Sequence, residues 1–260
     1  MIFDLQGRRK NVVRVIYALL ALLMGGGLVL LGIGGNANGG LLDAVGLGGG
    51  DSSSSDPAFE SQIDRANETL ASNPNDEKAL LTLARVHYLS GNNAIETDDQ
   101  GAQTITDDTI SEYNAADEAW QKYLATKPEK PDDGVASLMV QLYANLAGTE
   151  PSPTTLQERL DGAVEAAQIV VDARPSLGTN TTLATYAFLA GDTKTAEQAK
   201  KDALAEATDS TTKKQVTQQL AQAEAQGKAI AKSIEKSAPS EDQLENPLGG
   251  LGGTTPLPGG

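Results

Sequence analysis

The chain contains no cysteine and a single histidine, His87, among its 260 residues. The lack of cysteine excludes disulfides, thiolate metal sites, iron-sulfur clusters and a cysteine nucleophile, and it leaves the redox compartment undetermined. One histidine argues against the common zinc sites and against histidine-based catalytic chemistry. We therefore expect no catalytic residues, no metal ligands and no cofactor, and we interpret His87 as a structural residue.

Aromatic residues make up only 4% of the sequence, and the 35 acidic residues outnumber the 20 basic ones. With so few aromatic rings, the core is expected to be aliphatic and rich in alanine. The net charge of -15 argues against nucleic-acid binding, because phosphate recognition depends on clustered Lys and Arg. The first 50 residues are slightly basic, so the excess of negative charge lies in the rest of the chain.

One long apolar run is present, from Val12 to Gly35. It carries no charge from Val15 to Gly34, and these 20 residues, at about 1.5 Å each in a helix, span the roughly 30 Å of bilayer hydrocarbon. A cleavable secretory signal has a shorter apolar region of about 7 to 15 residues. We therefore favour an uncleaved transmembrane signal anchor at 12–35, with cleavage near Gly34 as the alternative.

Small residues recur within this run at positions where another helix backbone can approach closely. They are Ala18, Ala21, Gly25 and Gly32. A helix-helix contact in the membrane is one interpretation. We favour the other, in which the small residues face lipid, because glycine is common in membrane helices.

Charges on either side of the run predict its orientation. Arg8, Arg9, Lys10 and Arg14 lie at or before its start, whereas Asp43 and Asp51 are the first charges after it. Cytoplasmic flanks of membrane spans carry an excess of Lys and Arg. The sequence therefore predicts a single-pass protein of a bacterial cytoplasmic membrane, with a cytoplasmic N-terminus and an extracytoplasmic C-terminal body.

Composition divides the chain into five segments. Residues 1–11 form a basic N-terminus, 12–35 the span, and 36–55 a Gly/Ser-rich linker whose composition favours a flexible coil. Residues 56–237 form the body. Residues 238–260 are rich in Pro and Gly, and we expect disorder there.

The body has the periodicity of an all-α domain. Helices are expected from Pro57 to the Asn73-Pro74 stop and over 76–90, 109–126, 133–146, 155–173, 179–190, 193–208 and 211–236. Thr109 with Glu112, and Thr155 with Glu158, have the spacing of capping boxes. No stretch alternates with the period of two that a strand requires, so no strands are expected.

Two stretches of the body carry the pattern of a helical-hairpin repeat. Leu80, Leu83, Ala84, His87 and Gly91 lie at offsets 0, 3, 4, 7 and 11, and Ala116, Trp120, Tyr123 and Pro128 lie at offsets 0, 4, 7 and 12. These stretches resemble the first and second helices of the tetratricopeptide-repeat (TPR) family. An acidic insertion at 92–111 separates the two helices.

Later residues fit the same template less closely. A second unit has Leu138, Met139, Leu142 and Tyr143, with a register open by one residue, followed by Ala163, Ala167, Val170 and Pro175. A third has Leu183, Ala184, Ala187 and Gly191, then Ala196, Ala203 and Thr208. The resemblance implies a TPR-like right-handed helical solenoid of about three repeats plus capping helices, the last of which faces inward with Val216, Leu220 and Ala223.

In the TPR family, the stacked first helices form a concave face that receives an extended or helical peptide. The resemblance places seven residues on this groove: Leu81, Arg85, Tyr88, Gln141, Thr181, Thr185 and Phe188. It implies that Tyr88 and Phe188 are apolar anchors and that Arg85 orients a bound carboxylate or carbonyl. The alternative is that these side chains pack internally.

Together these features favour a non-enzymatic, membrane-anchored scaffold for a protein partner or client peptide. Such architecture resembles that of bacterial single-span repeat proteins that accompany envelope secretion, folding or assembly complexes. A holdase for exported proteins is an alternative, and a hydrolytic processing factor is a weaker one, because the sequence shows no convergent catalytic groups.

The predicted orientation has a direct test. Protease added outside spheroplasts should remove the body after residue 36 and spare the basic N-terminus, since only the body is expected outside. Immunoblots against tags at each end report both fragments. Full protection of the body would contradict this orientation.

Overall fold

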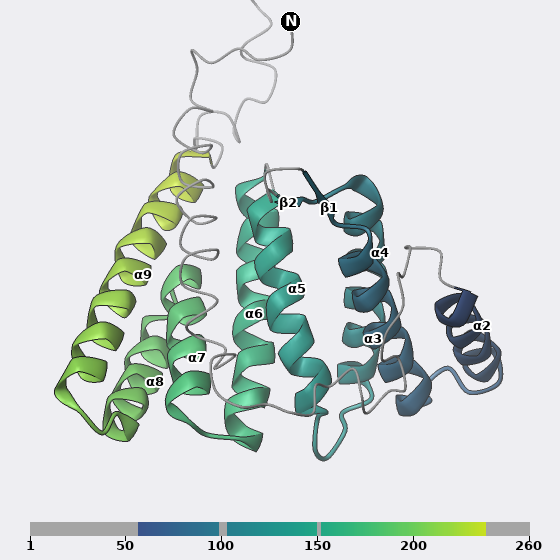
Figure 1. Cartoon of the computed structure of the whole chain (residues 1–260), viewed down its shortest axis with the longest axis horizontal. Coiled ribbons are helices and arrows are strands. Elements are labelled where there is room, and N and C mark those ends of the chain that lie inside the picture. The colour runs from purple at the N-terminus through teal and green to yellow at the C-terminus, as the bar shows by residue number, and fades with distance from the viewer. Residues whose placement is uncertain (1–56, 99–102, 150–151, 238–260) are drawn as a thin grey trace, which may run out of the picture.

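The computed structural model describes residues 57–98, 103–149 and 152–237 (Figure 1). Its helices are α2 (Pro57–Ser72), α3 (Glu77–Asn93), α4 (Asp107–Ala125), α5 (Asp133–Thr149), α6 (Pro153–Ala173), α7 (Leu177–Ala190), α8 (Thr193–Glu206) and α9 (Ser210–Ser237). The strands are β1 (Glu96–Thr97) and β2 (Gln103–Thr104). The predicted N-terminus at 1–11, span at 12–35, linker at 36–55 and tail at 238–260 lie outside the described residues. Among the residues that are described, no helix is long and apolar enough to cross a membrane.

The helices pack in consecutive pairs, so the predicted all-α class is confirmed. The most extensive contacts join α3 to α4, α5 to α6, and α7 to α8. Helix α2 packs against α3, α6 packs against α7, and the long α9 lies along α7. Figure 1 shows the pairs following one another across the molecule in chain order, from α2 at one end to α9 at the other.

Most of the predicted repeat-packing positions are buried. They are Leu80, Leu83, Ala84, Gly91, Ala116, Trp120, Tyr123, Ala163, Leu183, Ala184, Ala196 and Ala203. His87 and Pro128 are half-buried, and Pro175 and Gly191 are exposed. The His87 Nδ1 atom lies 2.7 Å from a carboxylate oxygen of Glu112, so this histidine links α3 to α4.

Two glycines at the same template position serve different purposes. Gly91 lies inside α3, where an added Cβ would come within 2.6 Å of the Tyr113 ring, so its small size permits α3 and α4 to approach. Gly191 instead ends α7 with a φ of 81°, a left-handed conformation that glycine adopts without steric cost. Only the first of them packs between helices.

Both predicted capping boxes are wrong, because α4 and α6 begin two residues earlier than expected. Thr106 caps α4 by accepting a hydrogen bond from the Thr109 backbone N–H at 3.1 Å. Ser152 precedes α6 without a side-chain cap, and Pro153 occupies the first turn. A capping box does occur at Ser176 and Thr179 of α7, where threonine replaces the usual Glu or Gln.

The insertion is shorter than expected and contains strands. Helix α3 continues to Asn93 and α4 begins at Asp107, so part of the 92–111 segment is helical. Between them β1 and β2 pair antiparallel, with Glu96 opposite Thr104. The expectation of no strands is wrong in this detail, since two-residue strands are too short to show period-two alternation.

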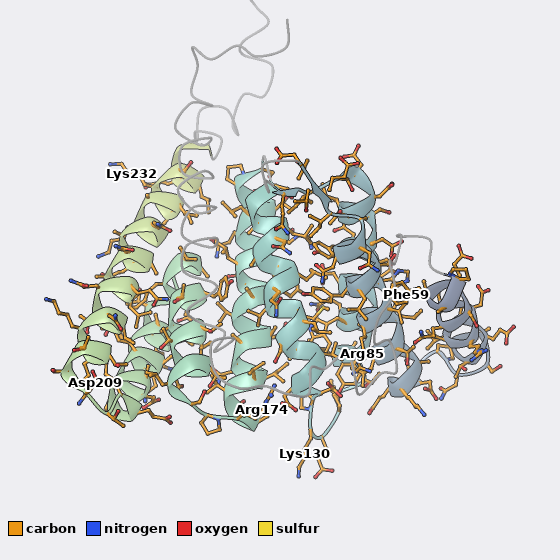
Figure 2. The ribbon with its side chains drawn as sticks, in the orientation of Figure 1. Phe59, Arg85, Lys130, Arg174, Asp209 and Lys232 are labelled. Carbon is orange, nitrogen blue, oxygen red and sulfur yellow. The ribbon has the colours of Figure 1, made fainter. Side chains whose placement is uncertain are left out.

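Helix α9 closes the row of pairs as an amphipathic helix. Its predicted inward residues Val216, Leu220 and Ala223 are buried, and Ile230 extends the same stripe. Asp209, just before its first turn, accepts hydrogen bonds from the backbone N–H groups of Thr211 and Thr212, both at 2.9 Å. Figure 2 shows Asp209 and Lys232 toward opposite ends of α9, an arrangement that complements the helix dipole.

The burial of Trp120 gives a stability prediction. Its ring is 0% exposed and lies 5.3 Å from the Tyr123 ring. Trp120→Ala should lower the free energy of unfolding by about 3 to 5 kcal/mol, because the cavity left behind adds to the lost apolar burial. Denaturant titration followed by circular dichroism measures this loss.

The matched control is Lys122→Ala, on an exposed position of the same helix. It should change the free energy of unfolding by no more than about 0.5 kcal/mol. A Trp120→Ala loss below about 1 kcal/mol would contradict the close packing of α4.

Candidate functional site

The predicted groove begins on α3 and α5, where three of its residues remain partly exposed. Leu81, Arg85 and Gln141 are half-buried, and Arg85 lies in the lower half of Figure 2, where α3 lies beside α5. Tyr88 is buried, and its hydroxyl donates a hydrogen bond to Gln141 Oε1 at 3.0 Å. The structure therefore brings these four residues to one side of α3, with the Tyr88 ring inside the core.

The other three predicted groove residues lie on α7 and are all buried: Thr181, Thr185 and Phe188. The two threonine hydroxyls donate to the carbonyls of Leu177 and Thr181, one helical turn earlier. Helix α9 approaches α7 so closely that a Cβ added to Gly227 would lie 1.8 Å from the Phe188 carbonyl oxygen. In this structure α9 lies along the helix that carries them, and all three side chains contribute to packing.

A tyrosine cluster lies next to the exposed end of the predicted groove. Tyr88 of α3 and Tyr113 of α4 stack with ring centroids 5.8 Å apart. The Tyr113 hydroxyl donates to Asn92 Oδ1 and accepts from Asn145 Nδ2 at 3.0 Å. The cluster thus joins α3, α4 and α5, and sequence reasoning missed it because Tyr113 and Asn145 lie outside the repeat pattern.

A second polar cluster joins α4, α5 and α6. Arg159 donates to Asp117 Oδ2 and to Asn114 Oδ1, and the Arg159–Asp117 ion pair is mostly buried. The Tyr143 hydroxyl donates to Asp117 Oδ1 at 2.6 Å. Burial, and then the neighbouring Asp117 carboxylate, raise the Tyr143 pKa well above its usual value. This cluster links successive pairs through side chains of high sequence separation.

Two hollows open on the side of the second helices α4, α6 and α8. The first, of about 630 Å³, lies between α4, α6 and the start of α8, and its lining includes Leu124, Pro128, Val164, Asp161 and Glu165. The second, of about 710 Å³, lies between α6, α7 and α8. Gln168 and Thr195 line both hollows, so the two are neighbours along the molecule. None of the residues expected to form a peptide groove lines either hollow.

One buried polar residue on the floor of the second hollow departs from the repeat pattern. Asn180 lies three residues before Leu183, at the template position that Leu80 occupies in the first unit. Leu80 is 1% exposed and Asn180 is 3% exposed, so a polar amide stands where packing calls for an apolar side chain. Comparing the units position by position reveals this signal in the sequence itself.

Neither a metal-binding group nor a similarity to a known protein assigns a function to the described residues. Among the described residues, no group of three or more His, Asp or Glu side chains is arranged to hold a metal ion. Comparison with protein-family models, with curated proteins and with solved structures finds no match. The candidate sites therefore depend on the geometry of this chain alone.

The tyrosine cluster predicts a loss of stability at high pH. Burial raises the pKa of Tyr113 to about 12, and Tyr88 adds to the increase, while the hydrogen bond with Asn145 opposes it. An unfolded tyrosine ionises near pH 10, whereas the folded one stays neutral. The stabilising contribution is therefore full below pH 10 and is lost as the pH rises from about 10 to 12.

Tyr113→Phe removes this ionisable group. The variant should lose about 1 kcal/mol at neutral pH for the missing hydrogen bonds. Its free energy of unfolding should then fall less steeply with pH between 10 and 12, by up to about 1.4 kcal/mol per pH unit. Equal slopes for the variant and the unsubstituted protein in urea titrations at several pH values would contradict the burial of the Tyr113 hydroxyl.

Proposed function

We propose that this chain is a non-catalytic scaffold that binds a partner protein and is held to a membrane by the apolar run at 12–35. The charges flanking that run favour a cytoplasmic N-terminus and an extracytoplasmic body. This arrangement suits an accessory subunit of an envelope secretion, folding or assembly complex, because it fixes the helical body beside the membrane.

The finer architecture that accompanies this function is a TPR-like right-handed solenoid of about three repeats with capping helices at both ends. Two findings support it. Residues at the family offsets are mostly buried between paired helices, and consecutive pairs contact each other in chain order. Repeat stacks of this kind present extended surfaces to which protein segments bind.

The observation that carries the proposal is an unpaired arginine on the α3–α5 strip, which consists of Leu81, Arg85 and Gln141. The Arg85 Nε atom is buried and has no hydrogen-bond partner. None of the ion pairs within the described part of the chain includes Arg85. The terminal Nη groups of Arg85 are not buried and form no hydrogen bond among the described residues, so they remain available to a carboxylate or carbonyl of a partner.

The composition of the strip favours a defined partner over promiscuous capture of unfolded chains. Promiscuous binders use flexible, methionine-rich or loop-rich surfaces that repack around many clients. The α3–α5 strip has one apolar side chain beside an arginine and an amide, on two rigid helices. It contains neither a nucleophile nor a base, so it supports binding and not hydrolysis.

Crosslinking in native membranes, followed by solubilisation and pull-down of the full chain, tests this function. A scaffold should recover one partner in stoichiometric amount. Arg85→Gln should weaken that association by about tenfold, because arginines in interface centres carry a large share of binding energy. Co-purification at graded concentrations measures the change in affinity.

The matched control is Arg65→Gln, which makes the same chemical change on an exposed position of α2. It should leave the association unchanged. Equal recovery with both variants would remove Arg85 from the interface. Recovery of many exported chains in small amounts would instead establish the holdase class.

A further inference from the structure

The hollow between α6, α7 and α8 combines a nearly buried amide with two lysines that form no ion pair among the described residues. Its floor is formed by Asn180 and Leu183 of α7, and its walls by α6 and α8. Asn180 is 3% exposed, and its side-chain amide forms no hydrogen bond within the described part of the chain. The polar atoms of this amide open into the hollow, so a ligand bound there can complete the hydrogen bonds that the fold leaves unmade.

The acidic side chains that line this hollow have partners within the protein, whereas two of its lysines form no ion pair within the described part of the chain. Glu197 forms an ion pair with Lys200 at 3.2 Å, and both carboxylate oxygens of Asp202 accept hydrogen bonds from Gln198. Lys194 and Lys201 also line the hollow but form no salt bridge among the described residues. Lys194 contributes to lowering the pKa of Asp192, after the stronger effect of the hydrogen bonds from Thr195. The two ammonium groups therefore remain open to external carboxylates.

We propose that this hollow binds an extended segment of a partner protein that carries carboxylate side chains. An asparagine amide offers one acceptor and two donors, which match the C=O and N–H of a peptide backbone. Lys194 and Lys201 bind the carboxylates at the rim. These lysines lie seven positions apart on α8, which is about 10 Å along a helix, and an extended chain covers that length with about three residues.

This site opens on the side of the second helices and goes beyond the proposed function, because it shares no residue with the α3–α5 strip. Arg85→Gln should leave binding at this hollow unchanged. If the acidic peptide does not bind, the proposal that Arg85 contacts a partner still stands. If Arg85→Gln does not weaken partner binding, the proposal for the hollow still stands.

Fluorescence anisotropy with the full chain in detergent micelles tests the assignment. The probe is a fluorescein-labelled peptide of four Gly-Ser-Asp units, and the comparison peptide has Lys in place of each Asp. The acidic peptide should bind about tenfold or more tightly than the basic one. Raising the salt concentration should weaken it, because exposed ion pairs are screened. Equal affinities for the two peptides would overturn the proposal.

Two variants locate the binding. Lys194→Gln with Lys201→Gln should weaken the acidic peptide by about tenfold. The matched control, Lys213→Gln with Lys214→Gln, removes the same charge from exposed positions on α9, away from the residues that line the hollow, and should change affinity by less than about twofold. An equal loss in both double variants would show a general charge effect and overturn the site.

Asn180→Leu distinguishes a role of the amide in peptide binding from a role in stabilising the fold. Leucine restores the apolar residue of the template, so the variant should unfold at the same or a higher temperature while binding the acidic peptide about tenfold more weakly. A lower unfolding temperature would show that the amide stabilises the fold, and unchanged affinity would show that it is not used. Either result overturns the role of Asn180.

A last variant tests the source of the bound segment. The tail at 238–260 carries three acidic and no basic residues, so it shares the chemistry of the probe. Removing it should leave the peptide affinity unchanged if a partner supplies the segment. A rise of about tenfold would show that the chain's own tail competes for the hollow, and would overturn the partner assignment.

Discussion

Close approach of paired helices is the constraint on which the rest of this structure depends. The small residues expected where paired helices cross are all fully buried: Ala84, Ala116, Ala184 and Ala196. Larger side chains at these points would push the axes apart and break contacts along the whole pair. Gly91 and Gly227 show the same constraint in stronger form, since even a methyl group at either position meets a neighbouring helix.

Small residues at these contacts limit how much apolar surface each one buries, because hydrophobic stabilisation scales with buried area. The link between successive pairs therefore relies on larger and more polar side chains. Tyr113 joins α3, α4 and α5, and the Arg159–Asp117 ion pair joins α6 to α4. Removing one member of a mostly buried ion pair leaves the other uncompensated, so these clusters favour one geometry between neighbouring pairs.

Periodicity alone predicts the helices and much of the core. Trp120, Ala116 and Leu80 follow from the spacing of apolar and small residues, and each is buried as expected. The failures have local causes. Thr109 looks like a helix cap from its spacing to Glu112, but Thr106 lies closer to the true start and takes that role. The Tyr113 cluster depends on contacts between distant residues that no local pattern encodes.

Two predictions made for α7, a cap at one end and an open groove, cannot both hold. Sequence periodicity predicts that α9 caps the row of pairs, and it does so by packing along α7. Thr181, Thr185 and Phe188, which the family pattern assigns to an open concave face, are buried on the helix that receives this cap. A first helix cannot both receive the cap and remain free for a peptide, so the partly exposed portion is restricted to Leu81, Arg85 and Gln141.

The packing of α9 along α7 also bears on Asn180, a polar residue at a template position that is apolar in the first unit. With α9 lying along α7, the hollow between α6 and α8 offers another approach to α7, and Asn180 lines it. The Asn180 side chain is 3% exposed, yet it gives up the apolar contacts that a leucine makes at the same template position. Packing alone favours leucine at this position, as Leu80 shows in the first unit. The retention of an amide there is accounted for if its hydrogen bonds are completed by a ligand.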